Sequence, residues 1–516
     1  MSDTVPRMTF WVKTLKENVT KNIFINGLAC PTLGWLTRVM EAKKPATLGE
    51  KFLMEQGQDI EIRARCLYPD GFLIKDADPE LAHKETIAAI KNPDVSAVFG
   101  ATFLVDRYVT KADILQRVKG GWILNEVKSG VTDDPKFIDD MAYTAMVAKR
   151  SGLKITGSCL FLVSKDFRLG MSNDRLFVKI DHTDEVQTRV ALFEPCWETV
   201  EKATRAPKKP DAKLRFVCRE CRELDLFSKC LGAGIKNHIF DIPRLHENKF
   251  EELNARGIVR IEDIPDTYPL TERQAIVRDC VKKNQPFVGA QLGKRVQSLT
   301  WPVYYLDFET VTTAFPLYSD IAPYYKIPTQ YSVHKYWWAG RDPEHYEFLA
   351  DPARDCRKEF AQSLIETLGD KGDIVVYGTF EKTILDKLKD ALPSFSGKIR
   401  SLIGRLVNLE QIVSAGFYHP DFYGRTSIKN VLPVLVSEMS YDSLEIKDGK
   451  SAMAAFAYMA LGKYKGDEIE EVKKSLKAYC AQDTLALYKV HQRLIEICGS
   501  KYEQQGSHHQ ASLEGF

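Results

Sequence analysis

The sequence predicts an α/β chain with two α/β domains joined by a helical connector. Its 516 residues are enough for two or three domains. Short apolar stretches typical of strands alternate with helical patterns in two regions, one ending near residue 236 and one beginning at residue 301. We therefore expect domains at 20–236 and 301–506, a connector at 237–300, and a disordered tail at 507–516.

The composition limits which partners the protein can bind and in which cellular compartment we expect it. The formal net charge is +2, so any binding of a nucleic acid must rely on local basic patches. No apolar run approaches the length of a membrane span, and the N-terminus lacks the order of a secretory signal. Eleven cysteines, an odd number, argue against a disulfide framework. We expect a cytoplasmic protein with no membrane partner.

The first candidate site lies on a predicted hairpin in the N-terminal domain. Glu126 and Lys128 are two residues apart on a strand, so they project from one face, and Asp113 lies on the preceding strand. Two carboxylates can hold a metal ion while a lysine orients water or stabilises a developing negative charge. The alternative is a solvated Glu-x-Lys pair, which contributes little on a hairpin surface.

The surrounding pattern carries a resemblance. A helix at 79–90, a strand at 97–105, the hairpin, a helix at 136–151 and a strand at 154–163 follow one another. This order, with Asp and then Glu-x-Lys, resembles the RecB-like PD-(D/E)xK nucleases and their restriction-endonuclease-like fold. The resemblance implies that His83 is a further metal ligand and that Tyr143 is catalytic. Those nucleases carry Gln-x-x-x-Tyr on the helix after the lysine, where this chain has Asp139 in place of the glutamine.

Four cysteines form a second pattern around this region. Cys218 and Cys221 are a Cys-x-x-Cys pair, Cys230 follows, and Cys30 stands upstream before a proline. Four thiolates bind zinc or an iron–sulfur cluster, and spacing does not choose between them; plain unligated thiols are the third reading. The order resembles CRISPR-associated RecB-like nucleases, which implies a 4Fe-4S cluster.

The second candidate site lies in the C-terminal domain. Asp307 and Glu309 are two apart at the end of an apolar strand and share a face. Glu381 follows a second predicted strand, and Tyr479 and Asp483 lie four apart on one helical face. Acids from three segments can hold two Mg²⁺ or Mn²⁺ ions about 4 Å apart, which suits phosphodiester hydrolysis. Solvated acids at a strand end are the alternative.

This set resembles the DEDD exonuclease superfamily, which has a ribonuclease-H-like fold. Its members carry Asp-x-Glu on the first strand, an acid after a later strand and Tyr-x-x-x-Asp on a late helix. The resemblance implies that Asp307, Glu309 and Asp483 bind metal and that Tyr479 orients the attacking water. Glu381 departs from the usual aspartate. Gln330, near the strand end, and His419 and Lys429, in an aromatic and basic stretch, are candidate nucleic-acid-binding residues.

Together the motifs resemble an uncharacterised bacterial family that fuses the two nuclease modules. The resemblance implies a metal-dependent nuclease that hydrolyses DNA at single-stranded ends, with two active sites, in DNA repair or defence against foreign DNA. One alternative is an exonuclease that trims RNA. Another is a nucleic-acid-binding protein in which one or both sites are inactive. The sequence does not predict a protein partner.

Overall fold

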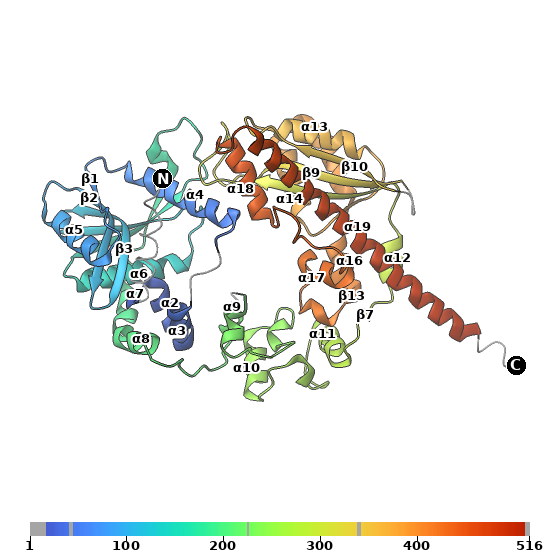
Figure 1. Ribbon diagram of the computed structural model, residues 1–516, viewed down its shortest axis with the longest axis horizontal. Helices are drawn as coiled ribbons and strands as arrows, with labels where there is room; N and C mark the ends of the chain where they lie inside the picture. Colours follow the sequence, from blue (N-terminus) through green and yellow to red (C-terminus); the bar gives the residue numbers. More distant parts are fainter. Residues whose placement is uncertain (1–16, 41–44, 224–225, 338–341, 511–516) are drawn as a thin grey trace. The chain divides into compact units, whose positions relative to one another are not determined.

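The computed structural model describes residues 17–40, 45–223, 226–337 and 342–510, and it has the mixed α/β structure that the sequence predicts (Figure 1). The chain divides into two compact units. Unit 1 comprises Met1–Ala233 and Thr313–Tyr325, and unit 2 comprises Gly234–Thr312 and Lys326–Phe516. Within the described part of the chain, no helix combines the length and the apolar character that crossing a membrane requires.

Unit 1 is built on a six-stranded sheet in the order β1-β2-β3-β4-β5-β6. The central strands β2, β3 and β4 form an antiparallel meander, and β4 pairs in parallel with β5. β1 is parallel to β2, and β6 is antiparallel to β5. β2 and β5 are buried along most of their length, and both are rich in apolar residues. The strands are β1 (Gly71–Leu73), β2 (Ala97–Val105), β3 (Tyr108–Val118), β4 (Gly121–Val127), β5 (Ile155–Val163) and β6 (Phe177–Asp181).

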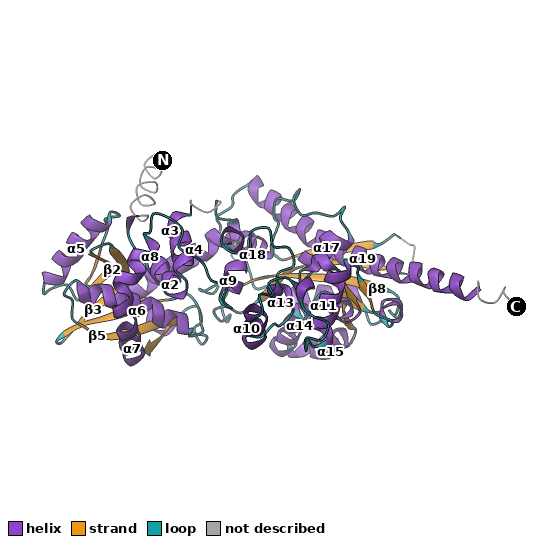
Figure 2. Ribbon diagram, turned by 90° about the horizontal axis from the view of Figure 1, so that it is seen from below, coloured by secondary structure: helices purple, strands orange, loops and turns teal. Residues whose placement is uncertain are grey.

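Helices flank the strands of this unit (Figure 2). The main core packs α5 and α6 against the sheet, and α6 buries the whole run Met141–Ala148. A proline in the first turn opens α3, α5 and α6, a position where the missing N–H costs nothing. The helices are α2 (Lys21–Ala29), α3 (Pro31–Val39), α4 (Leu48–Arg65), α5 (Pro79–Lys91), α6 (Pro135–Arg150), α7 (Thr183–Phe193), α8 (Trp197–Thr204) and α9 (Cys218–Glu223).

A short segment from the C-terminal half of the sequence belongs to unit 1. The sequence places Thr313–Tyr325 inside the domain expected at 301–506, but this segment packs with unit 1 instead. The reason is apolar burial: Ala314 is 1% exposed and lies in a core cluster with Ile60 and Val163. The guanidinium of Arg63 lies 3.4 Å from the centroid of the Phe315 ring.

Unit 2 is built on a five-stranded sheet in the order β10-β9-β8-β11-β12. β8 is central; it pairs antiparallel with β9 and in parallel with β11. β10 is antiparallel to β9, and β12 is parallel to β11. The strands are β8 (Val303–Val311), β9 (Ile327–Tyr336), β10 (Glu344–Leu349), β11 (Ile374–Val376) and β12 (Leu406–Asn408).

Helix α19 contacts β8 and β9. Helices α13 and α14 pack against the sheet in a hydrophobic core that also contains Leu306 of β8 and Val333 of β9. The helices of this unit are α10 (Glu247–Ala255), α11 (Glu272–Lys283), α12 (Leu292–Gln297), α13 (Arg357–Leu368), α14 (Phe380–Ala391), α15 (Ser396–Gly404), α16 (Leu409–Gly416), α17 (Ile428–Leu435), α18 (Gly449–Ala460) and α19 (Asp467–Gln510).

The segments expected to form a helical connector and a disordered tail match those expectations only in part. The expected connector, 237–300, is mainly helical but also contributes β7 (Phe287–Val288), which pairs with β13 (Phe417–Tyr418), and it belongs to unit 2. The first four residues of the expected disordered tail, 507–510, continue helix α19. Its remaining residues, 511–516, lie outside the described residues.

Candidate functional sites

Four carboxylates in unit 2 converge from three elements. Asp307 and Glu309 project from one face of the central strand β8. Glu381 lies in the first turn of α14, which begins shortly after β11, the parallel neighbour of β8. Asp483 lies on α19, which covers this face. Ligand oxygens of Asp307, Glu309 and Asp483 all lie within 4.8 Å of one another, and the described residues offer no second group of three or more acidic, His or Cys side chains this close.

The carboxylates of this cluster repel one another, so a bound positive charge would stabilise them. Burial, followed by repulsion from the neighbouring carboxylates, raises the pKa values of Asp307 and Glu309 well above their usual range. Burial raises the pKa of Glu381 to about 7, with repulsion from Asp483 adding to it. Glu381 is 3% exposed, and its Oε2 has no hydrogen-bond partner. Carboxylates that repel one another in a buried cluster, one of them with an oxygen that has no hydrogen-bond partner, fit divalent cations, which prefer such oxygen ligands.

Two tyrosines hold Asp483. The hydroxyl of Tyr441 donates to Asp483 Oδ1 at 2.5 Å, and the Tyr479 hydroxyl lies near enough to lower the pKa of this carboxyl. Burial raises the pKa of Asp483 to about 6, although both hydroxyls and the Lys429 ammonium oppose the rise. The Tyr-x-x-x-Asp spacing predicts the contact of Tyr479, because residues four apart share a helical face. Tyr441 lies in the loop before α18, and no spacing in the sequence connects it to Asp483.

Lys429 lies beside the cluster and is exposed. Its ammonium lowers the pKa values of Glu309 and Asp483, so it is close enough to act on both. It stands in the first turn of α17 and faces solvent. The N-terminal end of α18 closes the site on another side, because a Cβ added to Gly449 would lie 3.7 Å from Glu309 Oε2. Asp448, the N-cap of α18, is a further acid that acts on Glu309.

Gln330 and His419, the other two residues expected to bind a nucleic acid, differ from Lys429 in their exposure. Gln330 is 1% exposed and donates through Nε2 to the carbonyl of Leu476 at 2.9 Å. It therefore joins β9 to α19 and offers no accessible surface to a nucleic acid, because alternation along β9 points it toward the helix rather than to solvent. His419 caps a short turn, accepting from the backbone N–H of Asp421, and stays half-buried.

The second site lies in unit 1, at the β3–β4 hairpin. Asp113 accepts a hydrogen bond from the backbone N–H of Val127 at 2.8 Å, which ties the two strands at this point. Burial, then repulsion from Glu126, raises the pKa of Asp113 well above its usual range. Lys128 Nζ lies 2.8 Å from Glu126 Oε1. Burial alone would lower the pKa of Lys128, but attraction to Glu126 and Asp140 raises it, so the lysine is charged.

Three residues that the sequence analysis did not single out also belong to this site. Asp140 Oδ2, on α6, lies 2.8 Å from Lys128 Nζ and 3.1 Å from Lys21 Nζ. Lys21 Nζ also lies 3.5 Å from Glu126 Oε1. Glu61, on α4, is near enough to raise the pKa of Asp113. Only tertiary packing brings these elements to the hairpin, so no local pattern marks them.

His83 and Tyr143, which the resemblance assigns to this site, and Asp139, which stands in place of the family's glutamine, have other contacts. His83 accepts through Nδ1 from the backbone N–H of Leu104 at 3.4 Å, which places its ring against β2. Tyr143 is fully buried and donates to the carbonyl of Val19 at 2.6 Å, so it is a structural anchor in the core rather than a group open to substrate. Asp139, at the glutamine position, forms an ion pair with Arg189.

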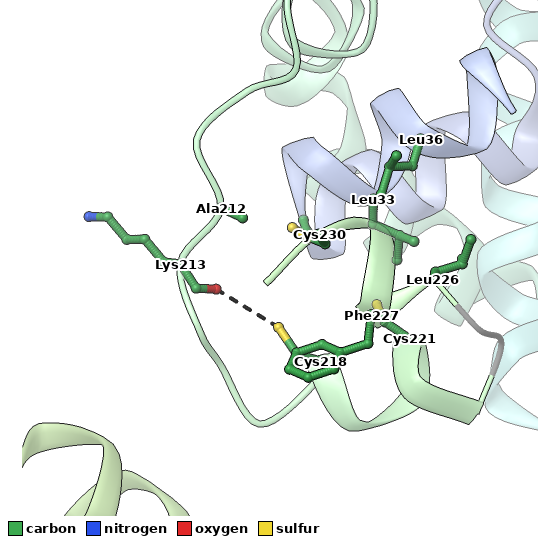
Figure 3. A pocket seen from close by; sticks show the side chains of 10 residues that line it. Leu33, Leu36, Ala212, Lys213, Cys218, Cys221, Leu226, Phe227 and Cys230 are labelled. Carbon is green, nitrogen blue, oxygen red and sulfur yellow. Dashed lines mark hydrogen bonds between the residues drawn. The ribbon is translucent and has the colours of Figure 1, made fainter. Parts of the chain in front are cut away.

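The four cysteines lie together in unit 1. They line one small pocket, whose remaining wall is mainly apolar (Figure 3). Burial raises the pKa of Cys221 to about 11, and the nearby thiols of Cys218, Cys30 and Cys230 add to the rise. The Sγ of Cys218 lies 3.8 Å from the carbonyl oxygen of Lys213, which closes the pocket on the side of the preceding loop. All four are free thiols.

The spacing of the thiols bears on the ligand. Four thiolates around a single zinc ion, with bonds of about 2.3 Å, lie about 3.8 Å apart. Among the described residues no three cysteine sulfurs lie within 4.8 Å of one another. Four thiols that line one pocket can bind either zinc or an iron–sulfur cluster.

Comparison with known proteins gives one partial match. A model of a domain of unknown function, DUF2779, matches residues 304–427. This span includes Asp307, Glu309 and Glu381 but ends before Tyr441 and Asp483. No curated protein and no solved structure matched the chain.

Proposed function

We propose that this protein is a metal-dependent nuclease that hydrolyses DNA phosphodiesters, as an exonuclease on single-stranded ends, with one active site in each unit. The observation that carries the proposal is the convergence of Asp307, Glu309, Glu381 and Asp483 from three separate elements of unit 2. Such a set costs stability unless cations occupy it, because buried like charges repel. In this reading unit 1 has a restriction-endonuclease-like fold and unit 2 a ribonuclease-H-like fold.

In unit 2, Asp307, Glu309 and Asp483 would hold Mg²⁺ or Mn²⁺, with Glu381 completing the set. When bound, such ions activate a water molecule and stabilise the charge on the phosphate oxygens. Tyr441, from the loop before α18, orients Asp483 by its hydrogen bond, and Tyr479 lies beside this carboxylate on α19. Lys429 offers an exposed ammonium beside the carboxylates, where it can bind the phosphate of the incoming strand.

In unit 1, Asp113 and Glu126 would hold a metal ion of the same kind. The neighbouring carboxylates keep Lys128 charged, so it can stabilise negative charge at the reacting phosphate. The hydrogen bond from Val127 to Asp113 keeps the two acids in register across the hairpin. His83 stays a predicted further ligand.

We propose that Cys30, Cys218, Cys221 and Cys230 hold a 4Fe-4S cluster, with zinc as the alternative. The gathering of the four thiols in one pocket with a mainly apolar wall supports the cluster. Cys30 lies between α2 and α3, and the other three lie in or after α9. The ligand would thus join the beginning of unit 1 to its end.

The test is digestion of 5′- and 3′-labelled single strands of DNA and RNA with Mn²⁺. Wild type is compared with Lys128→Ala in unit 1, Asp307→Asn in unit 2, and the exposed control Glu366→Gln on α13. We expect each site variant to remove a different set of products and the control to remove none. If neither site variant changes any product, the nuclease proposal is wrong.

Two alternatives have their own support. Preferential cleavage of the RNA strands, lost in Asp307→Asn, would favour an RNA-trimming enzyme, since carboxylate sites of this kind act on phosphodiesters of either polymer. A nucleic-acid-binding role with an inactive unit 1 is favoured by the engagement of Lys128 with two carboxylates. Binding of labelled strands without cleavage in any metal would support that role. Cytoplasmic location, and a role in repair or defence, belong to the proposal.

A further inference from the structure

We propose that Lys21 is a second cationic residue of the unit 1 active site and that it binds the substrate phosphate. This inference rests on the proposed nuclease function of unit 1. Lys21 Nζ lies 3.1 Å from Asp140 Oδ2 and 3.5 Å from Glu126 Oε1, so it shares both of these carboxylates with Lys128. The Lys21 side chain is 30% exposed and Glu126 only 5%, so Lys21 lies on the solvent side of the group.

The backbone that carries Lys21 is firmly held. Val19, two residues earlier, is fully buried, and its N–H donates to the carbonyl of Arg107 at 2.7 Å. Its carbonyl accepts from the N–H of Val109 at 3.1 Å and from the Tyr143 hydroxyl at 2.6 Å. These contacts attach the start of α2 to β3, the strand that carries Asp113. Lys21 is therefore positioned by β3, the strand that carries Asp113.

In this arrangement Tyr143 acts on the site indirectly, by holding the backbone that carries Lys21. The resemblance implies that Tyr143 is catalytic, but its hydroxyl lies in the core and fixes Val19. In our proposal it is a positioning residue for Lys21. The aromatic contacts of Phe24 with Tyr143 and Tyr108 hold the buried face of α2 in place.

Charge balance explains why a second lysine is needed. Asp113, Glu126, Asp140 and Glu61 set four carboxylates against the ammonium groups of Lys128 and Lys21. One divalent cation then brings the group to neutrality. Without Lys21 the metal-bound group would keep a net negative charge and would repel the phosphodiester anion.

The experiment measures unit 1 alone by using the full chain with Asp307→Asn to remove unit 2 cleavage. Lys21→Met, Lys21→Arg and the exposed control Lys91→Met are assayed on labelled single-stranded DNA with Mn²⁺. We expect Lys21→Met to lower kcat/KM by about 10- to 100-fold, chiefly through KM, as for the loss of one charge-assisted contact. Lys21→Arg restores most of the activity, and the control matches the parent.

Binding at different salt concentrations separates a phosphate contact from a structural effect. With Ca²⁺ as the ion, loss of one contact to a single strand flattens the slope of log K against log salt by about 0.7. Lys21→Met should show this change while keeping the melting temperature of the parent. Unchanged kcat/KM and slope, or reduced activity that Lys21→Arg does not restore, would overturn the inference. If Lys128→Ala leaves cleavage intact in this background, it is the nuclease function of unit 1 that fails.

Discussion

At the scale of single residues, the most informative contact is the hydrogen bond from Tyr441 to Asp483. It is short, it reaches an oxygen of a proposed metal ligand, and it comes from a loop that the sequence did not mark. The Tyr441 and Tyr479 rings lie 6.0 Å apart, so both approach Asp483 from neighbouring directions. The orientation of this carboxylate therefore depends on two groups and not on the helical tyrosine alone.

Tyr441→Phe tests this contact. We expect about 10-fold lower activity of the unit 2 site, or a matching rise in the Mn²⁺ concentration needed, which is the usual effect of losing a partner of a metal ligand. The measurement is cleavage against Mn²⁺ concentration in a Lys128→Ala background, with Tyr464→Phe as control. Identical curves for Tyr441→Phe and its parent would show that Tyr479 suffices.

The buried acids predict how stability depends on pH. The folded-state pKa of Glu381 is raised to about 7 and that of Asp483 to about 6, above the values of an unfolded chain. The metal-free folded state therefore binds more protons than the unfolded state between about pH 4 and pH 7. Its free energy of unfolding should fall as pH rises through this window, by several kcal/mol.

Thermal unfolding from pH 4 to pH 8, with and without Mn²⁺, measures this effect. Mn²⁺ should raise the melting temperature more at pH 8 than at pH 4, because metal binding requires ionised carboxylates. In Glu381→Gln the fall with pH should be smaller. A metal-free melting temperature that rises steadily across the window would contradict the prediction.

At the scale of elements, the segment Thr313–Tyr325 shows how a loop can serve another part of the fold. It leaves unit 2 directly after β8, which carries Asp307 and Glu309, and packs within unit 1. Besides the contact of Arg63 with Phe315, the backbone N–H of Ala314 donates to Gln56 on α4 at 2.6 Å. We infer that the segment stabilises α4.

Phe315→Ala tests this role. Loss of the ring removes the contacts with Arg63 and Phe167 and should destabilise α4 by about 1–3 kcal/mol, less than for a fully buried phenylalanine. Hydrogen exchange in peptides covering residues 48–65 should become faster, while peptides from α13 should be unaffected. Leu461→Ala, at an exposed position, is the control. Unchanged exchange in α4 would show that the segment lies on unit 1 without supporting it.

The cysteine pocket is the second prediction at this scale. Protein purified without oxygen should carry iron and inorganic sulfide and absorb visible light, and Cys221→Ser should lose all three signals. Thiols must lose their protons to bind iron or zinc, and the pKa of Cys221 is raised to about 11. Reconstitution of the cluster should therefore weaken as the pH falls. Zinc in place of iron would support the alternative ligand. Cys66→Ser, at an exposed cysteine, is the control.

At the scale of the whole molecule, the two carboxylate sites belong to different units and share no residue. We therefore expect the effects of substitutions in the two sites to be independent, within about 0.5 kcal/mol in activation free energy. Lys128→Ala, Asp307→Asn and the double variant would be compared on both strand polarities. If the change in activation free energy of the double variant is smaller than the sum of the changes in the two single variants, the two sites act on the same substrate in the same reaction sequence.

The sequence alone determined the local parts of this protein. Hairpin β3–β4, helix α6 and strand β5 follow their apolar patterns, because strands and helices of this kind depend on short-range periodicity. The same periodicity places Glu126 beside Lys128 and Asp307 beside Glu309. It also places Tyr479 one helical turn from Asp483, as the structure has them.

Tertiary structure decided which distant groups meet. Lys21, Asp140 and Tyr441 reach their sites only through the packing of α2, α6 and the loop before α18, and Thr313–Tyr325 joins unit 1 by burying apolar surface. It also turned Tyr143 and Gln330 inward, where their polar atoms satisfy buried carbonyls. Spacing in a sequence sets the face that a side chain shares, but burial and charge balance between distant elements decide what that side chain contacts.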